Sequence, residues 1–157
     1  MKTLFYIVVW SFMLSSCSQA TEAHFNKEDS VPTEVTFHKT HEPKKENAPF
    51  SDIVQVGNLY FLSGQIGMNH TERVLVEGGI TIETKQTLEN IKAVLAQHDM
   101  DMSNVVKALV ILDNIDDFQA FNKVYKTYFP QKPARTTFAA EALAAGALIE
   151  IEVVAVK

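Results

Sequence analysis

Short segments of alternating or continuous apolar residues indicate the strands of this chain. Val35 and Phe37 alternate with polar neighbours, and the Gly57-Asn58 pair is the turn signal of a hairpin. Residues 105–112 form a continuous run rich in Val and Ile, as expected of a buried strand. The predicted strands cover residues 35–37, 53–56, 59–63, 105–112, 135–140 and 148–156, and residues 43–49 and 64–79 are expected to be irregular.

Two segments with apolar residues at helical spacing predict the helices. Within residues 81–98, apolar side chains recur at i, i+3 and i+7, at Leu88, Ile91 and Leu95. A second helix is expected to begin at Asp116 as its N-cap and to end before Pro130. Its apolar face holds Phe118, Phe121, Tyr125 and Tyr128. The order β-β-β-α-β-α-β-β predicts an α+β fold, a mixed sheet with two helices packed on one face.

The last predicted strand has two unequal faces. One face is wholly apolar and suits packing under the helices: Ile149, Ile151, Val153 and Ala155. The other face carries Leu148, Glu150, Glu152, Val154 and Val156. If this face were exposed in a monomer, its apolar residues would promote aggregation, so we expect another subunit to cover it. Carboxylates on a covered face need partners. Arg135, on the preceding strand with Thr137 on the same side, is the candidate partner.

The first residues are predicted to be a targeting signal. Residues 3–14 form an apolar run of signal-peptide length, too short to span a membrane comfortably. The run ends in Leu14-Ser15-Ser16-Cys17, which resembles the bacterial lipoprotein box, and Cys17 is the one cysteine of the chain. A plain secretory signal with an incidental cysteine is the alternative. We therefore expect a lipoprotein signal peptide over residues 1–16, a polar tether over residues 17–33 and a domain over residues 34–157. This predicts a lipid-anchored protein of the bacterial cell envelope, periplasmic or at the outer membrane.

Net charge and composition argue against several classes of protein and of binding site. The chain of 157 residues carries a formal net charge of -5, which argues against a nucleic-acid binder that relies on phosphate contacts. A single cysteine excludes a disulfide framework and a cysteine-based metal site. The histidines near the start of the chain are scattered among charged residues, so we predict no metal site there: His24, His38 and His41.

Several segments together resemble the reactive intermediate deaminase (RidA/YjgF) family. They comprise residues 56–67 (VGNLYFLSGQIG), 76–80 (VEGGI), 87–95 (TLENIKAVL), 133–137 (PARTT) and 148–152 (LIEIE). The resemblance runs from about Val35 to the C-terminus, and the order and spacing of the last two segments are fairly specific. It implies a chorismate-mutase-like fold, a homotrimer with three clefts between subunits, and no organic or metal cofactor. Enzymes of this family hydrolyse small 2-imino or enamine acids to 2-oxo acids and ammonia.

The resemblance also implies roles for individual residues. Arg135 would hold the substrate carboxylate with its planar fork of donors, and the backbone of Thr137 would line the same pocket. Glu150 would orient or activate the attacking water. Ser63 and Asn122 match polar pocket positions that bind substrate or brace the wall. Phe50 stands where many family members carry a tyrosine, so a phenolic hydroxyl at the cleft is lost.

Each role has a simpler alternative. Arg135 and Glu150 are alternatively a structural ion pair across a subunit interface, and Glu152 a solvated rim charge. Ser63 alternatively packs against Gly64 at a tight turn, and Asn122 lies on a polar helix face. At the level of function, the main rival of the deaminase is a non-catalytic trimeric binder of small carboxylates at the cell envelope. Ribonuclease activity, reported for some relatives, fits the acidic charge and the membrane tether poorly.

Overall fold

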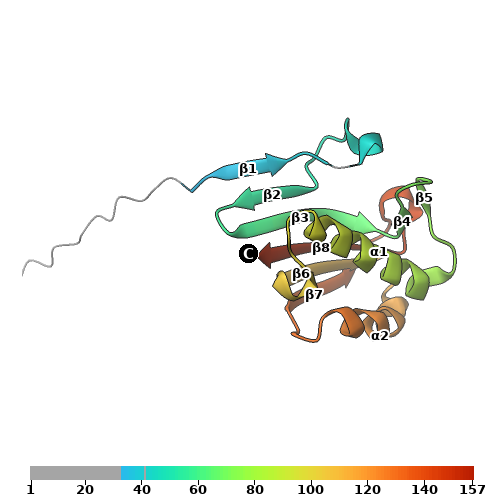
Figure 1. Cartoon of the computed structure of the whole chain (residues 1–157). Helices are drawn as coiled ribbons and strands as arrows, with labels where there is room; N and C mark the ends of the chain where they lie inside the picture. The colour runs from blue at the N-terminus through green and yellow to red at the C-terminus, as the bar shows by residue number, and fades with distance from the viewer. Residues whose placement is uncertain (1–32, 41) are drawn as a thin grey trace, which may run out of the picture. The chain divides into compact units, whose positions relative to one another are not determined.

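The computed structural model describes residues 33–40 and 42–157, and the main feature of these residues is a twisted six-stranded sheet with helices on one side (Figure 1). The sheet has six strands in the order β1-β2-β3-β8-β6-β7. Neighbouring strands are antiparallel except for β6 and β7, which are parallel. The strands are β1 (Val35–His38), β2 (Ile53–Val56), β3 (Leu59–Ile66), β6 (Val105–Leu112), β7 (Ala134–Ala139) and β8 (Ile149–Val156).

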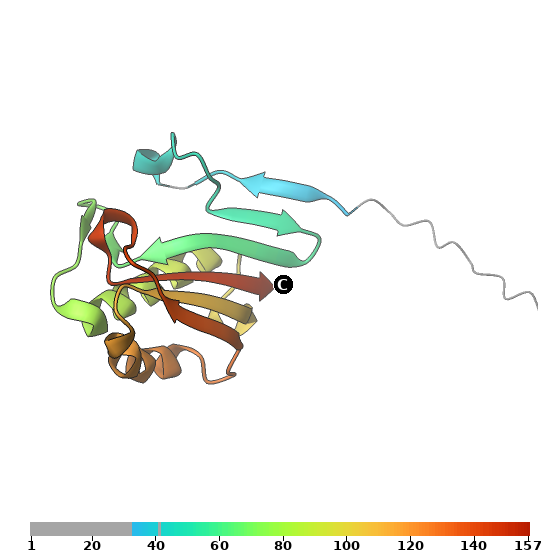
Figure 2. The same ribbon diagram turned by 180° about the vertical axis from the view of Figure 1, so that it is seen from behind.

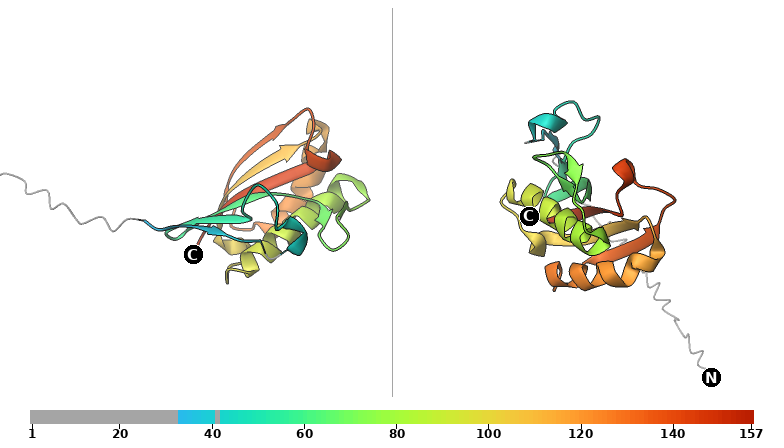
Figure 3. Two further views of the ribbon diagram at one scale, coloured as in Figure 1. Left: turned by 90° about the horizontal axis from the view of Figure 1, so that it is seen from above. Right: turned by 90° about the vertical axis from the view of Figure 1, so that its right-hand side faces the viewer.

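Two helices cover one face of this sheet, as the view from above in Figure 3 and the reverse view in Figure 2 show. They are α1 (Gly79–Ala96) and α2 (Phe118–Tyr128). The two helices also contact each other, and Tyr128 Oη donates a hydrogen bond of 2.6 Å to Glu89 Oε1. A small hairpin of β4 (Met68–Asn69) and β5 (Val74–Leu75) follows β3, and short 3-10 turns lie at Pro43–Lys45, Met102–Asn104, Ile115–Asp117 and Ala144–Gly146. The α+β prediction, with two helices on one face of a mixed sheet, is confirmed.

The hydrophobic core lies between the sheet and the helices. The inward residues of β8 are all buried, as their alternation predicted: Ile149, Ile151, Val153 and Ala155. They meet inward residues of α1 such as Leu88 and Ile91, and Phe121 of α2. Burying side chains of this size stabilises the fold by roughly 1.5–3 kcal/mol each, before entropy is subtracted.

The opposite face of the sheet carries apolar side chains that no helix covers. Cα pairing places Phe37, Val54, Phe61 and Val154 in one row across β1, β2, β3 and β8. Phe37 is 67% exposed and Phe61 is 42% exposed, although both are large aromatic residues. A row of this kind on an otherwise folded chain is typical of a surface that contacts another protein.

The structure differs from the sequence predictions at element boundaries. Strand β3 continues beyond Ser63 to Ile66, because a bulge between Leu62 and Gln65 restores its pairing with β8. Part of the segment predicted to be irregular therefore belongs to the sheet. Asp116 does not cap the second helix: Asn114 caps a 3-10 turn by accepting from the Asp116 N–H, and α2 begins only at Phe118.

The predicted signal peptide over residues 1–16, Cys17, and the tether up to residue 32 lie outside the described residues. Within the part of the chain that the structure describes, no helix is long and apolar enough to cross a membrane.

Candidate functional site

Glu150 lines a cavity of about 310 Å³ at one end of the sheet. The cavity lies where β3 ends beside β8, and its remaining walls come from the segment before β2, the β4–β5 hairpin and the 3-10 turn before β8. Its apolar walls are Phe50, Ile66, Met68, Ala144 and Ala145. A small concave site with apolar walls and a few polar groups is the usual form of a metabolite pocket.

The Glu150 carboxyl group packs directly over Gly64. A Cβ atom built on Gly64 would lie only 2.8 Å from Glu150 Cδ, so any side chain there would displace the carboxylate. Among the described residues, no hydrogen bond or ion pair partners this carboxylate. Burial raises the pKa of Glu150, and the neighbouring charge of Glu152 raises it further. A carboxyl group with a raised pKa beside a cavity is suited to proton transfer.

Arg135 lies on the helix-covered side of β7, enclosed by aromatic rings of α2. Its Nη1 donates a hydrogen bond of 2.8 Å to Asn122 Oδ1. The guanidinium carbon lies 4.6 Å from the ring centroid of Tyr125 and 5.2 Å from that of Phe121. Such rings attract a cation and fix its plane. The structure therefore brings Arg135 and Asn122 together, and it gives Arg135 no carboxylate partner among the described residues.

Two buried hydroxyl groups stand near Arg135 without a hydrogen-bond partner. They are Thr137 Oγ1, two residues further along the same face of β7, and Tyr125 Oη. A buried polar group without a partner is costly and calls for a physical explanation. Neither oxygen is exposed in the single chain, so both belong to the polar surroundings of Arg135 inside the protein.

Arg135 and Glu150 do not meet within one protomer. Strand β6 separates β7 from β8, and Arg135 pairs with Ala108 of β6 whereas Glu150 pairs with Ile111. Ala108 belongs to the buried core under the helices, and Ile111, three positions further along, lies on the other face. The expectation that Arg135 partners the carboxylates of the last strand is therefore wrong for a single chain. Any contact between Arg135 and Glu150 requires a second copy.

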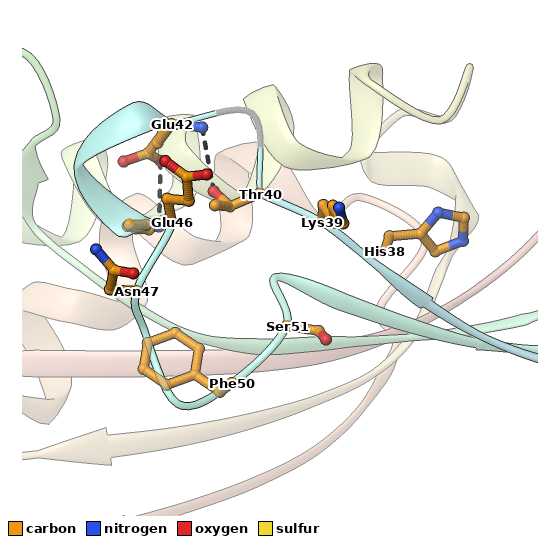
Figure 4. Close-up of a pocket in the computed structure, with 9 residues that line it drawn as sticks. His38, Lys39, Thr40, Glu42, Glu46, Asn47, Phe50 and Ser51 are labelled. Carbon is orange, nitrogen blue, oxygen red and sulfur yellow. Dashed lines mark hydrogen bonds and ion pairs between the residues drawn. The ribbon is translucent and has the colours of Figure 1, made fainter.

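Of the remaining predicted site residues, Ser63 holds a neighbouring segment in place and Phe50 lines the Glu150 cavity. Ser63 Oγ donates a hydrogen bond of 2.7 Å to the Ser51 carbonyl oxygen, which fixes the segment before β2 against β3. Phe50 is 55% exposed and lines the Glu150 cavity. It also lines a second cavity of about 580 Å³, bounded by polar side chains such as His38 and Glu46 (Figure 4). Phe50 thus borders both cavities.

A charged network beside the cavity was missed by the sequence analysis. Glu42 lies 3.1 Å from Lys45 Nζ, 2.8 Å from His70 Nδ1 and 3.9 Å from Arg73 Nη1. Lys45 also lies 3.4 Å from the buried Asp52. Burial is the main cause that lowers the pKa of His70, and the Lys45 charge adds to it. The network joins the segment before β2 to the β4–β5 hairpin, and Lys45, His70 and Arg73 all line the Glu150 cavity.

A second buried acid supports the start of β8. Glu83 of α1 accepts a hydrogen bond of 2.8 Å from the Leu148 N–H, and Gly67 packs against its side chain. Burial raises the pKa of Glu83 despite the backbone donors that favour its charged form. Glu83 therefore joins α1 to the start of β8 and does not line the Glu150 cavity.

Known proteins share both the sequence and this fold. The model of the endoribonuclease L-PSP family matches residues 39–157. The 2-iminobutanoate/2-iminopropanoate deaminase of Capra hircus is 44% identical over 110 residues, covering 69% of this chain and 80% of that protein. The protein of the same name from Homo sapiens is 43% identical over 110 residues, with the same coverage. The prediction of a deaminase-like hydrolase agrees with these names.

Solved structures give the same result. RidA from an Antarctic Psychrobacter is 30% identical with a TM-score of 0.71, over 78% of this chain and 99% of that chain. A Thermotoga maritima protein described as a candidate endoribonuclease is 40% identical with a TM-score of 0.72, over 78% of this chain and 97% of that chain. With the family match over residues 39–157, these similarities show that the chain belongs to the endoribonuclease L-PSP family, the family of the RidA/YjgF proteins.

Proposed function

We propose that this protein hydrolyses small 2-imino or enamine acids to 2-oxo acids and ammonia, at clefts between the subunits of a homotrimer. The observation that carries the proposal is the unpartnered Glu150 carboxyl group, whose pKa is raised, in a small cavity at an uncovered end of the sheet. Relatives that are 41% to 44% identical and are named 2-iminobutanoate/2-iminopropanoate deaminase support the choice of reaction.

Arg135 would bind the substrate carboxylate. Among the described residues its guanidinium donates one side-chain hydrogen bond, to Asn122, so further N–H groups remain for a ligand. The aromatic rings and Asn122 hold the fork in one orientation, which reduces the entropy lost on binding. The substrate's imino carbon would then face the Glu150 of the neighbouring subunit.

Glu150 would act first as the general base and then as the general acid of the hydrolysis. Water attacks the electrophilic carbon of the imine, whose nitrogen is protonated, while the Glu150 carboxylate takes one proton of the water, which gives a neutral carbinolamine. The protonated Glu150 then returns that proton to the amino nitrogen, the C–N bond breaks, and ammonia leaves as the C=O bond of the 2-oxo acid forms. The carbinolamine hydroxyl proton passes to solvent or to the departing ammonia. An imino carbon is already electrophilic, so no metal or organic cofactor enters these steps.

Two features of the single chain support an assembly of several copies, of which the homotrimer is our proposal. The row of Phe37, Val54, Phe61 and Val154 needs a cover, and Arg135 needs a second copy to approach a Glu150. A closed cyclic assembly satisfies both, because every subunit then offers its uncovered face to a neighbour.

We also propose that the protein is attached to the cell envelope through lipidated Cys17, after removal of residues 1–16. The Leu14-Ser15-Ser16-Cys17 sequence after an apolar run supports this attachment. The test is membrane fractionation of wild type and Cys17→Ala with labelled fatty acid. Wild-type protein that takes up no label and stays soluble would contradict the anchor without affecting the proposed reaction.

The test of the reaction is a pair of variants of the full chain, assayed with 2-iminopropanoate generated in situ. Arg135→Ala should lose binding and turnover, with kcat/KM reduced by roughly 30-fold to several thousand-fold, since truncating such a charged pair costs about 2–5 kcal/mol. Glu150→Gln should keep binding of the 2-oxo acid product but lose turnover. A wild-type protein that binds 2-oxo acids without any rate above the spontaneous one would instead be the non-catalytic binder.

A further inference from the structure

The Glu150 cavity contains a positively charged side chain that the proposed reaction does not use. Arg73 lines this cavity together with Glu150, and its side chain is 38% exposed. Among the described residues, the ion-pair partner of its guanidinium is Glu42, at the long distance of 3.9 Å. Glu42 also forms an ion pair with Lys45 at 3.1 Å and lies 2.8 Å from His70 Nδ1, so the Glu42 carboxylate keeps a charged partner when Arg73 turns away from it.

The backbone at Arg73 is strained. Arg73 has φ 64, in the left-handed region that favours glycine, and it closes a turn whose Asn69 carbonyl accepts from the Arg73 N–H at 2.8 Å. The described chain has four non-glycine residues with positive φ, and two of them, Arg73 and Ala145, line this cavity. Strain of this kind clusters at functional sites, where a particular side chain is needed in spite of it.

From this placement we infer that Arg73 is a specificity-determining residue that selects 2-imino acids with a second carboxylate, as in 2-iminosuccinate. The inference rests on the proposed function, in which Arg135 holds the carboxylate that all 2-imino acids share. The substrate side chain would then extend into the cavity beside Glu150, and a carboxylate at its end would take the place of Glu42 beside Arg73. The reaction class that supplies such a substrate is oxidation of an acidic amino acid at its α-carbon.

The charged groups of the cavity determine how strongly Arg73 should favour a substrate with a second carboxylate. Lys45 is neutralised by Glu42 and Asp52, and the lowered pKa of His70 leaves that ring neutral near pH 7. Arg73 is therefore the cation that offsets Glu150 for an incoming second carboxylate. Without Arg73 the cavity would repel a dicarboxylate. Because the guanidinium is partly exposed and screened by solvent, we expect a change of about tenfold in selectivity, near the lower end for a charge-assisted hydrogen bond.

The experiment compares two substrates that differ only at the far end. 2-Iminosuccinate and 2-iminobutanoate share a four-carbon chain, and one ends in a carboxylate where the other ends in a methyl group. Both are generated by amino-acid oxidases, with catalase present to protect the 2-oxo acids, and release of the 2-oxo acid is measured above the enzyme-free rate. The wild-type full chain should prefer 2-iminosuccinate. Arg73→Gln should lower the ratio of the two rates about tenfold, and Arg73→Lys should keep part of the preference.

Lys132→Gln is the matched control, because Lys132 is also a cation with positive φ, at 56, and lies outside this cavity. It should leave the ratio unchanged. Arg73→Gln that leaves the ratio at the wild-type value, or lowers both rates equally, would overturn the inference. The second result would mean that Arg73 binds the shared carboxylate.

A binding measurement separates this inference from the proposed function. The dissociation constants of the two products, oxaloacetate and 2-oxobutanoate, are measured by calorimetry. Arg73→Gln should weaken oxaloacetate about tenfold and leave 2-oxobutanoate unchanged. A protein that hydrolyses neither imine but shows this pattern would refute the deaminase and keep the dicarboxylate site. A protein that hydrolyses both imines, but binds both products equally in wild type and variant, would refute the dicarboxylate site alone.

Discussion

Gly64 offers a way to move the Glu150 carboxylate by a single methyl group. A Cβ atom on Gly64 would lie 2.8 Å from Glu150 Cδ and closer still to its Oε1, whereas ordinary contact begins near 3.4 Å. The carboxyl carbon must therefore retreat by about 0.6 Å, and its oxygens by on the order of 1 Å. Because the atoms that clash are the far end of a flexible side chain, the strand itself need not move.

We expect Gly64→Ala to fold and assemble normally but to lose activity. A misplacement of about 1 Å in a catalytic group lowers the rate by roughly 100-fold. The free energy of unfolding should stay within about 1 kcal/mol of wild type, because the Glu150 side chain can swing away. The assay is release of the 2-oxo acid from 2-iminopropanoate, with thermal unfolding followed by circular dichroism on the same samples.

Gly67→Ala is the contrasting variant. A Cβ atom there would meet the Glu83 side chain and also the helix backbone, at 3.0 Å from the Glu83 carbonyl oxygen and 3.1 Å from its Cα. Since a backbone cannot retreat cheaply, this variant should lose about 1–3 kcal/mol of stability. Wild-type kcat/KM in folded Gly64→Ala would refute the placement of Glu150 at the reacting centre.

Three further predictions concern charge and assembly. The acid limb of the kcat/KM profile should report a pKa above 4.5 for Glu150, and Glu152→Gln should shift that limb to lower pH because one cause of the raised pKa is removed; an unmoved limb would contradict the assignment. The pKa of Glu83 is higher in the folded protein than in the unfolded chain, so the protonated side chain stabilises the fold at low pH. This contribution to the free energy of unfolding is lost as the pH rises through the folded-state pKa of Glu83. The melting temperature of Glu83→Gln relative to wild type should therefore rise between about pH 4 and about pH 7, and a constant difference would argue against it. Phe61→Glu should turn the proposed trimer into monomers in analytical ultracentrifugation, since it places a charge in the uncovered apolar row, and a variant that stays trimeric would show that the interface lies elsewhere.

The sequence predicted the parts of the fold that local patterns encode. The run at residues 105–112 matches β6 residue for residue, and the alternation in β8 correctly assigned Ile149 and Ile151 to the core. The pattern failed at β3, because Gly64 looks like the end of a strand although it sits at a bulge within one. It failed at Asp116 because Asn114, two residues earlier, caps the preceding 3-10 turn instead.

The candidate site was predicted only in part, because order along the chain is not order in the sheet. Arg135 and Glu150 lie on successive strands of the sequence, yet β6 is inserted between those strands, and the two side chains point to opposite faces. The Arg73 side chain was missed for another reason. It lies in a turn without periodicity, and its positive φ and its place beside Glu150 become visible only in three dimensions.

Because Arg135 and Glu150 lie on opposite faces of the sheet, the proposed active site needs residues from two subunits. In the proposed trimer, each cleft would combine the arginine of one subunit with the glutamate of the next. Two inactive variants, Arg135→Ala and Glu150→Gln, would then complement each other when refolded together. Every mixed trimer would contain one cleft built from two intact halves, so about a quarter of all clefts would work after random mixing in equal amounts. Activity in the cell would accordingly depend on whole trimers, and a subunit with one defective half would disable a neighbour's intact one.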